Sequence, residues 1–165
     1  MSSAGTALCL FQPTKTHSLS VSSVILWLKF IPGFTMSDMS DPDHARLTDG
    51  KLRPCPDSPN CVCSEYPGNA HSIEPLIFPG DPDAAWARLI GILLDQPRTT
   101  IVSQTDDYIE ARIRTRILRF VDVLEFRLDR ATKRINVRSA SKVGYSDLGT
   151  NRRRVESLRT LFCDK

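Results

Sequence analysis

A long run of alternating residues in the C-terminal half most constrains the fold of this chain. From residue 109 to 117, apolar or small side chains take every second position, and glutamate or arginine takes the positions between them. The stretches 118–128 and 135–137 alternate in the same way, and the turn-forming sequence Asp129–Thr132 separates them. Period-two alternation with short turns predicts an antiparallel meander with one face buried and the other in water.

Two amphipathic helices flank the predicted strands. The first is expected to begin at Asp81 and to end near Gln96, and the second to begin at about Thr150 or Asn151. The stretch Ile73–Phe78 predicts a short edge strand, because a proline interrupts it. The fold class is therefore α+β, with an antiparallel four- to five-stranded meander sheet and two helices packed on one face.

The chain divides into an N-terminal extension, a linker and one domain. Residues 52–165 form the predicted α+β domain, and residues 36–51 are a polar linker. Residues 1–35 read either as a weak targeting-like segment or as a spurious extension, and their apolar run is too short to span a bilayer. A start at Met36 or Met39 predicts a cytoplasmic protein, and a real export segment predicts the cell envelope. Contact with a membrane surface through residues 19–34 is a further interpretation.

Basic residues concentrate in the C-terminal part of the chain. Residues 98–165 contain 16 Lys and Arg against 9 Asp and Glu, although the whole chain has a net charge of only +3. This excess indicates either a small anionic ligand or ordinary solvated charge. Nucleic acid is not the expected partner, because no aromatic residues interleave with the arginines of the alternating strands: Arg112, Arg114, Arg116 and Arg134.

Cys55 and Cys61 flank a proline-rich segment that is expected to form a rigid irregular loop. The prolines could hold the two sulfurs close enough for a disulfide, which an oxidising compartment would favour. A metal site that adds Cys63 and His71 is an alternative, but the spacing matches no common zinc signature. Reduced, inert thiols are the third interpretation, and no metal or cofactor is predicted.

Three consecutive arginines open the last predicted helix, where the helix dipole favours acidic residues. One explanation is an anion held by Arg152, by neighbouring hydroxyl groups and by the helix amides. The other is an internal network in which Asp147, Asp122 or Glu156 pairs with the arginines.

Asp122 lies on the apolar side of its predicted strand, between Phe120 and Leu124. A carboxylate that points into a core must be paired or neutralised. Asp122 is therefore either a buried partner of an arginine or a general base or ligand-holding acid.

Three segments closely resemble the family called domain of unknown function 1499. They are the proline and cysteine segment 54–62, the Phe-Val-Asp sequence at 120–122 and the long segment 138–156. The resemblance extends from about Leu52 to Leu161. It implies a compact domain, found in bacteria and some photosynthetic eukaryotes, with no established activity.

Three positions depart from the pattern of that family. Cys63 stands where a serine is expected, and Val123 stands where a second aspartate is expected. Lys142 replaces an expected arginine, which keeps the charge but loses the planar fork. The departure at Val123 weakens any mechanism that needs paired carboxylates.

The leading hypothesis is a non-catalytic binding or accessory domain with a polar anion-binding site at a loop–helix junction. Its ligand-binding residues would be Asp122, Arg138, Ser139, Ser141, Asp147, Asn151 and Arg152. The alternative is a small hydrolase or isomerase that acts on an anionic metabolite with Asp122 as acid or base.

Overall fold

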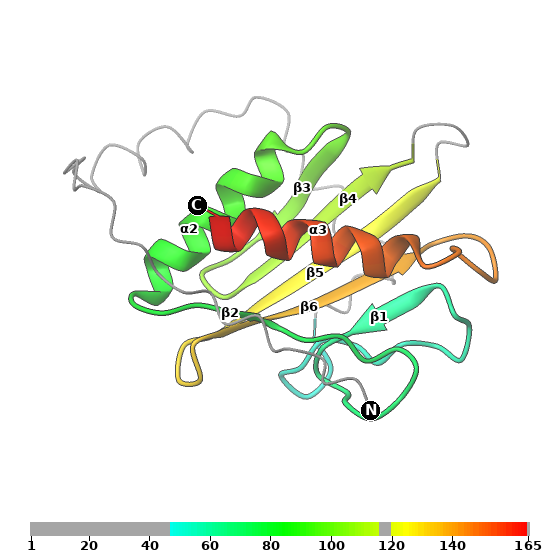
Figure 1. Cartoon of the computed structure of the whole chain (residues 1–165), viewed down its shortest axis with the longest axis horizontal. Helices are drawn as coiled ribbons and strands as arrows, with labels where there is room; N and C mark the ends of the chain where they lie inside the picture. Colours follow the sequence, from blue (N-terminus) through cyan, green and yellow to red (C-terminus); the bar gives the residue numbers. More distant parts are fainter. Residues whose placement is uncertain (1–46, 116–119, 165) are drawn as a thin grey trace. The chain divides into compact units, whose positions relative to one another are not determined.

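The computed structural model describes residues 47–115 and 120–164, which form an antiparallel sheet covered on one face by two helices (Figure 1). The elements, in chain order, are β1 (Cys61–Cys63), β2 (Leu76–Ile77), α2 (Pro82–Asp95), β3 (Thr99–Gln104), β4 (Tyr108–Arg114), β5 (Val121–Asp129), β6 (Arg134–Ser141) and α3 (Thr150–Asp164). The predicted α+β class, with two helices on one face of an antiparallel sheet, is confirmed.

Four consecutive strands form the predicted meander, in the order β6, β5, β4 and β3. β1 and β2 both pair with β6, so that the described residues make a six-stranded sheet. The prolines before Cys61 predict an irregular loop through Cys63, but Cys61–Cys63 form the strand β1. It is only three residues long and lies at the edge of the sheet, where few ladder hydrogen bonds are needed.

Several expectations concern residues outside the described ranges. The extension at 1–35 lies there, as do Met36, Met39 and most of the linker at 36–51. Arg116 lies there too. Within the described part of the chain, no helix combines the length and apolar character needed to cross a membrane.

Local chemistry fixes the start of α2 where the sequence predicts it. The Asp81 side chain accepts a hydrogen bond from the Ala84 amide at 2.9 Å, and Pro82 occupies the first turn. The amide of Gln96 bonds to the carbonyl of Leu93, which ends the helix just before Pro97. A capping aspartate and a proline in the first turn are a common way to begin a helix.

The main hydrophobic core lies between the sheet and the two helices. It takes the inward side chains of the alternating strands and the apolar stripes of α2 and α3. Its fully buried members include Phe78, Leu89, Leu93, Ile109, Leu124, Phe126, Ile135, Val137, Val155 and Phe162.

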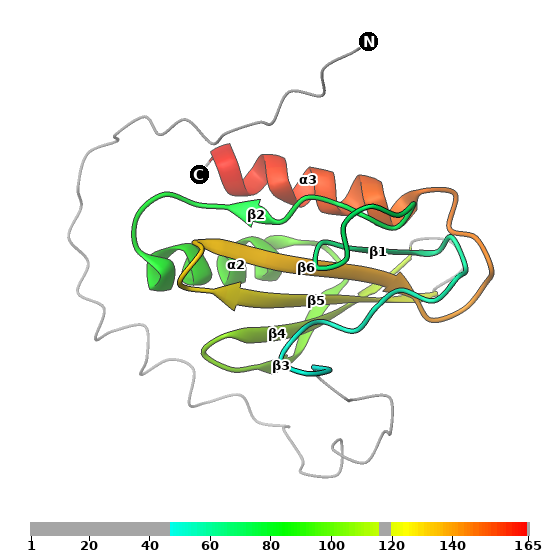
Figure 2. The ribbon, with the colours of Figure 1, turned by 90° about the horizontal axis from the view of Figure 1, so that it is seen from below.

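The other face of the sheet is less exposed to solvent than the alternation predicts. Figure 2 shows the segment before β1 on the side of the sheet opposite α3. Under this cover Glu125 is buried and accepts hydrogen bonds from the Tyr108 hydroxyl at 3.1 Å and from Arg138 Nη1 at 2.6 Å. Burial, and then the charge of Glu125, raise the pKa of Tyr108 far above its usual value. A charged cluster therefore sits beneath a loop that the strand pattern alone could not place.

Leu89 and Leu94 offer a matched test of this packing, because both lie on α2 but only Leu89 is buried. We expect Leu89→Ala to lower the free energy of unfolding by about 2–5 kcal/mol, since it leaves a cavity in the core. Leu94→Ala, at 67% exposure, should change it by less than about 0.5 kcal/mol. Urea denaturation measures both values, and equal losses would contradict the assigned helix face.

Candidate functional site

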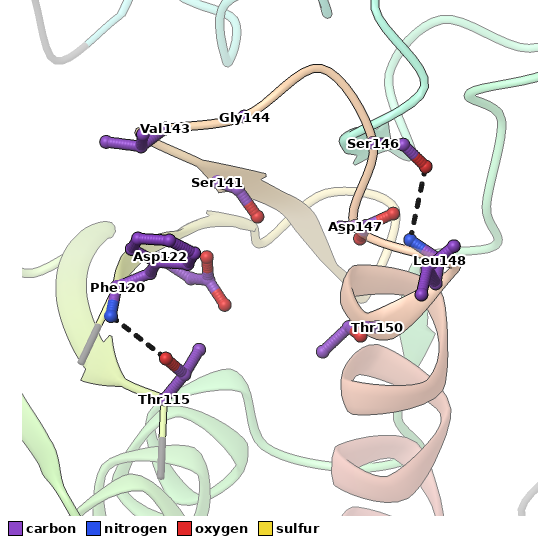
Figure 3. Close-up of a pocket in the computed structure, with 10 residues that line it drawn as sticks. All are labelled: Thr115, Phe120, Asp122, Ser141, Val143, Gly144, Ser146, Asp147, Leu148 and Thr150. Atoms are coloured by element: carbon purple, nitrogen blue, oxygen red, sulfur yellow. Dashed lines mark hydrogen bonds between the residues drawn. The ribbon is translucent and has the colours of Figure 1, made fainter. Parts of the chain in front are cut away.

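A pocket of about 390 Å³ opens at the end of the sheet where β5 begins and β6 ends. The start of α3 and the loop before it form the opposite wall (Figure 3). Its lining residues are Thr115, Phe120, Asp122, Ser141, Val143, Gly144, Ser146, Asp147, Leu148 and Thr150. The volume falls in the range of small-molecule sites, which is about 300–1,000 Å³.

Asp122 lies at the base of this pocket. It is the second residue of β5, directly opposite Ser141 of β6, so both side chains point toward the helices. Asp122 is buried, and its Oδ2 accepts a hydrogen bond from Arg154 of α3. The expected buried pairing of Asp122 with an arginine is thus present. Figure 3 shows its carboxylate directed into the pocket, with the Ser141 hydroxyl close by.

Asn151 joins the pocket base to the rest of the fold. It is completely buried, and its amide uses all of its hydrogen-bonding positions. Its Oδ1 accepts from Ser139 Oγ at 2.6 Å and from Arg154 Nη1 at 2.7 Å. Its Nδ2 donates to the Asn60 carbonyl at 2.8 Å and to Ser141 Oγ at 3.0 Å. One side chain therefore connects α3, β6 and the loop before β1.

Asp147 caps the start of α3. Its two carboxylate oxygens accept from the amides of Gly149 at 2.9 Å and Asn151 at 2.6 Å. The backbone of Leu148 and Gly149 takes positive φ values of 53° and 75°, which turns the chain into the helix. Asp147 thus occupies the helix start, where an external anion was expected to bind.

The other two arginines of the first turn bond to backbone carbonyls. Arg152 Nη2 donates to Ala70 at 3.0 Å and to Ser72 at 2.9 Å, which ties α3 to the segment after β1. Arg153 Nη1 donates to the carbonyl of Leu148 at 2.9 Å. Of the pairings that the sequence offered for an internal network, the Asp122–Arg154 pair is present, whereas Asp147 bonds to amides and Glu156 pairs with Arg159.

Arg138 lies on the opposite face of the sheet. Adjacent residues of a strand point in opposite directions, so Arg138 and Ser139 of β6 cannot share a site on one face. Arg138 instead pairs with the buried Glu125, and its Nε has no hydrogen-bond partner among the described residues.

The structure brings together only part of the predicted site. The residues that meet in one network are Asp122, Ser139, Ser141 and Asn151. Asp147 lies at the pocket wall, Arg152 reaches away toward the segment after β1, and Arg138 is on the far face.

Sequence reasoning did not single out Arg154 among the three arginines. The helical period could have selected it, because Arg154 follows Asn151 by three residues and adjoins the buried Val155. No sequence signal could have found Asn60, because its carbonyl reaches Asn151 from 91 positions away.

The predicted disulfide between Cys55 and Cys61 is present, with Cα atoms 5.6 Å apart. It closes the loop that carries Asn60. Asn60 Nδ2 donates to the Gly144 carbonyl at 2.5 Å, and its own carbonyl accepts from the Ser141 amide at 3.0 Å. The crosslinked loop therefore holds Ser141 and Gly144, two residues that line the pocket.

The remaining thiol of this segment is inert. Cys63 is buried, and this burial raises the pKa of its thiol to about 11, so it is protonated at neutral pH. Among residues 47–115 and 120–164, no group of three or more His, Cys, Asp or Glu side chains is placed to hold a metal ion.

A family model described as "Protein of unknown function (DUF1499)" matches residues 51–162. No curated protein and no solved structure matches the chain.

The contacts of Asn60 predict that the disulfide stabilises the pocket wall. We expect Cys55→Ala combined with Cys61→Ala to lower the free energy of unfolding by about 2 kcal/mol, because the short loop regains freedom in the unfolded chain. Hydrogen exchange should also speed up at the Ser141 amide, whose acceptor is the Asn60 carbonyl. Exchange at the Ile109 amide, in the core meander, should follow only the global change in stability. An unchanged exchange rate at the Ser141 amide would contradict the coupling between the disulfide and the pocket wall.

Proposed function

The chain belongs to the DUF1499 family, whose description names no activity, and we propose that its domain is a non-catalytic binding domain. Its pocket would take a small molecule with an apolar body and a hydrogen-bond donor, such as a hydroxyl or amine group. The observation that carries this proposal is the direction of the Asp122 carboxylate and the Ser141 hydroxyl, both of which face the pocket (Figure 3).

The polar base of the pocket retains unused hydrogen-bonding capacity. Arg154 occupies Oδ2 of Asp122, whereas Oδ1 has no donor among the described residues. Ser141 Oγ accepts a hydrogen bond from Asn151, which leaves its own proton to donate. A ligand hydroxyl could donate to Asp122 and accept from Ser141 at the same time.

The walls of the pocket favour an apolar body on the ligand. Phe120, Val143 and Leu148 contribute aromatic and aliphatic surface around the polar base. Apolar walls with a few placed polar groups are typical of small-molecule sites, in which the polar groups set orientation and specificity.

The alternative ligand is the anion predicted from the sequence, but the pocket has few groups that could bind it. The two carboxylates of Asp122 and Asp147 line the pocket, and no described arginine or lysine lines it. The helix amides that an anion would use at Gly149 and Asn151 already bond to Asp147. We therefore favour a neutral or cationic donor over a phosphate or carboxylate.

Catalysis with Asp122 as acid or base is the second alternative. The described lining contains no histidine, lysine or cysteine that could act as a partner in proton transfer. Asp147, the other carboxylate of the lining, is already held by two amides. These contacts support binding rather than turnover.

Thermal denaturation of the full chain tests the ligand class. Aromatic and aliphatic alcohols and primary amines form one panel, and inorganic phosphate and small carboxylates form the other. We expect a member of the first panel, at a hundredfold excess over its Kd, to stabilise the fold by about 2.7 kcal/mol. Phe120→Ala removes one apolar wall and should weaken that ligand about tenfold.

Ile77→Ala is the matched control, because Ile77 is exposed like Phe120 but belongs to β2, away from the pocket. If only phosphate or carboxylates raise the midpoint of thermal denaturation, and Arg152→Ala abolishes this increase, the anion alternative would be established instead. Turnover of any panel member that Asp122→Asn abolishes without unfolding the chain would establish the enzyme alternative.

A further inference from the structure

Three of the exposed apolar side chains line the pocket, and a fourth, Tyr145, belongs to the loop that forms one of its walls. Phe120 is 41% exposed, Val143 60%, Tyr145 76% and Leu148 85%. They make up four of the seven large hydrophobic side chains that are exposed in the described part of the chain. The other three are spread over β2, α2 and α3: Ile77, Leu94 and Leu161. A grouping of this kind marks a surface that contacts something apolar.

The loop holds Leu148 in water at an energetic cost. Its φ of 53° lies in the left-handed region, which is unfavourable for a residue that has a β-carbon. The Leu148 amide donates to Ser146 Oγ at 3.3 Å, and its carbonyl accepts from Arg153 at 2.9 Å. These contacts fix the outward direction of a side chain that no described residue covers.

Basic residues lie at the same end of the domain as the pocket mouth. Arg114 ends β4 directly opposite Val121 of β5, and Lys142 follows β6, where its amide bonds to the Val121 carbonyl, so the two basic residues lie on either side of the start of β5. Like Val121, Arg114 faces the side of the sheet away from Asp122. Arg153 lies across the pocket in the first turn of α3. Arg114, Lys142 and Arg153 are all exposed. Figure 1 shows the ends of β4 and β6 and the start of β5 at one end of the sheet, with the β6–α3 loop.

We propose that the pocket mouth docks on the surface of an anionic lipid bilayer. The docking surface consists of Phe120, Val143, Tyr145 and Leu148, and the exposed residues Arg114, Lys142 and Arg153 lie at the same end of the domain. The apolar side chains enter the headgroup region, and the cations contact lipid phosphates. This docking does not depend on a ligand in the pocket.

Size and charge favour a bilayer over a protein partner. A stable protein interface buries about 1,200–2,000 Å² in total, which requires far more than four apolar side chains. A bilayer needs only a few inserted side chains, because each nearby lysine or arginine adds electrostatic attraction to anionic lipid. The two carboxylates of the pocket already have partners inside the domain, since Asp122 pairs with Arg154 and Asp147 caps α3.

Vesicle co-sedimentation of the full chain tests the proposal. The vesicles are phosphatidylcholine alone and phosphatidylcholine mixed with phosphatidylglycerol. We expect the wild type to prefer the mixed vesicles and the variant with Tyr145→Ser and Leu148→Asn to bind them about tenfold more weakly. Asparagine suits the left-handed backbone at 148, so this variant should fold. Arg114→Gln should weaken binding about fivefold.

Ile77→Ser is the control, because Ile77 pairs with Arg134 at the far end of β6 from Ser141. It should bind the mixed vesicles like the wild type. Residues 1–46 are present in every variant, so any membrane affinity they supply is common to all. Equal binding by the wild type and the Tyr145→Ser, Leu148→Asn variant would overturn the proposal. Failure of the wild type to bind either vesicle would also overturn it and would point to a protein partner.

Discussion

The pocket end of this fold depends on one buried amide, that of Asn151. A buried amide whose donors or acceptors lack partners costs about 1–3 kcal/mol for each unsatisfied group. Asn151 avoids this cost only while α3, β6 and the loop before β1 hold their present positions, because its four hydrogen bonds reach all three. Such a network specifies one arrangement, because a shift of any member leaves a buried group unpaired.

The same network explains why arginines can open a helix against its dipole. Each unfavourable charge in the first turn costs about 0.3–1 kcal/mol. The Asp147 carboxylate restores negative charge at the helix start, and Arg154 gains the buried carboxylate of Asp122. Arg152 gains two carbonyls from the segment after β1. The arginine cluster thus acts as a set of structural contacts that shape the pocket beside it.

Much of the fold followed from the sequence because its signals were local. Period-two alternation located the meander and correctly put Asp122 on the helix side, and the residues around Asp81 located α2. The same alternation should have separated Arg138 from Ser139, since neighbours in a strand face opposite ways. The cover over Glu125 and the contact from Asn60 come from residues far away in sequence, and local pattern carries no information about them.

The central claim is that Asn151 holds the pocket end of the domain together, and urea denaturation of Asn151→Leu tests it most directly. Leucine has the same branched arrangement of side-chain heavy atoms as asparagine but makes none of its four hydrogen bonds. The matched control is Asn136→Leu, because Asn136 is also buried but its side chain has one hydrogen bond among the described residues, from Ser64 Oγ at 3.3 Å. The account predicts that Asn151→Leu loses at least about 3 kcal/mol of unfolding free energy and Asn136→Leu about 1 kcal/mol. Losses of equal size would show that Asn151 is an ordinary buried amide and would contradict the account.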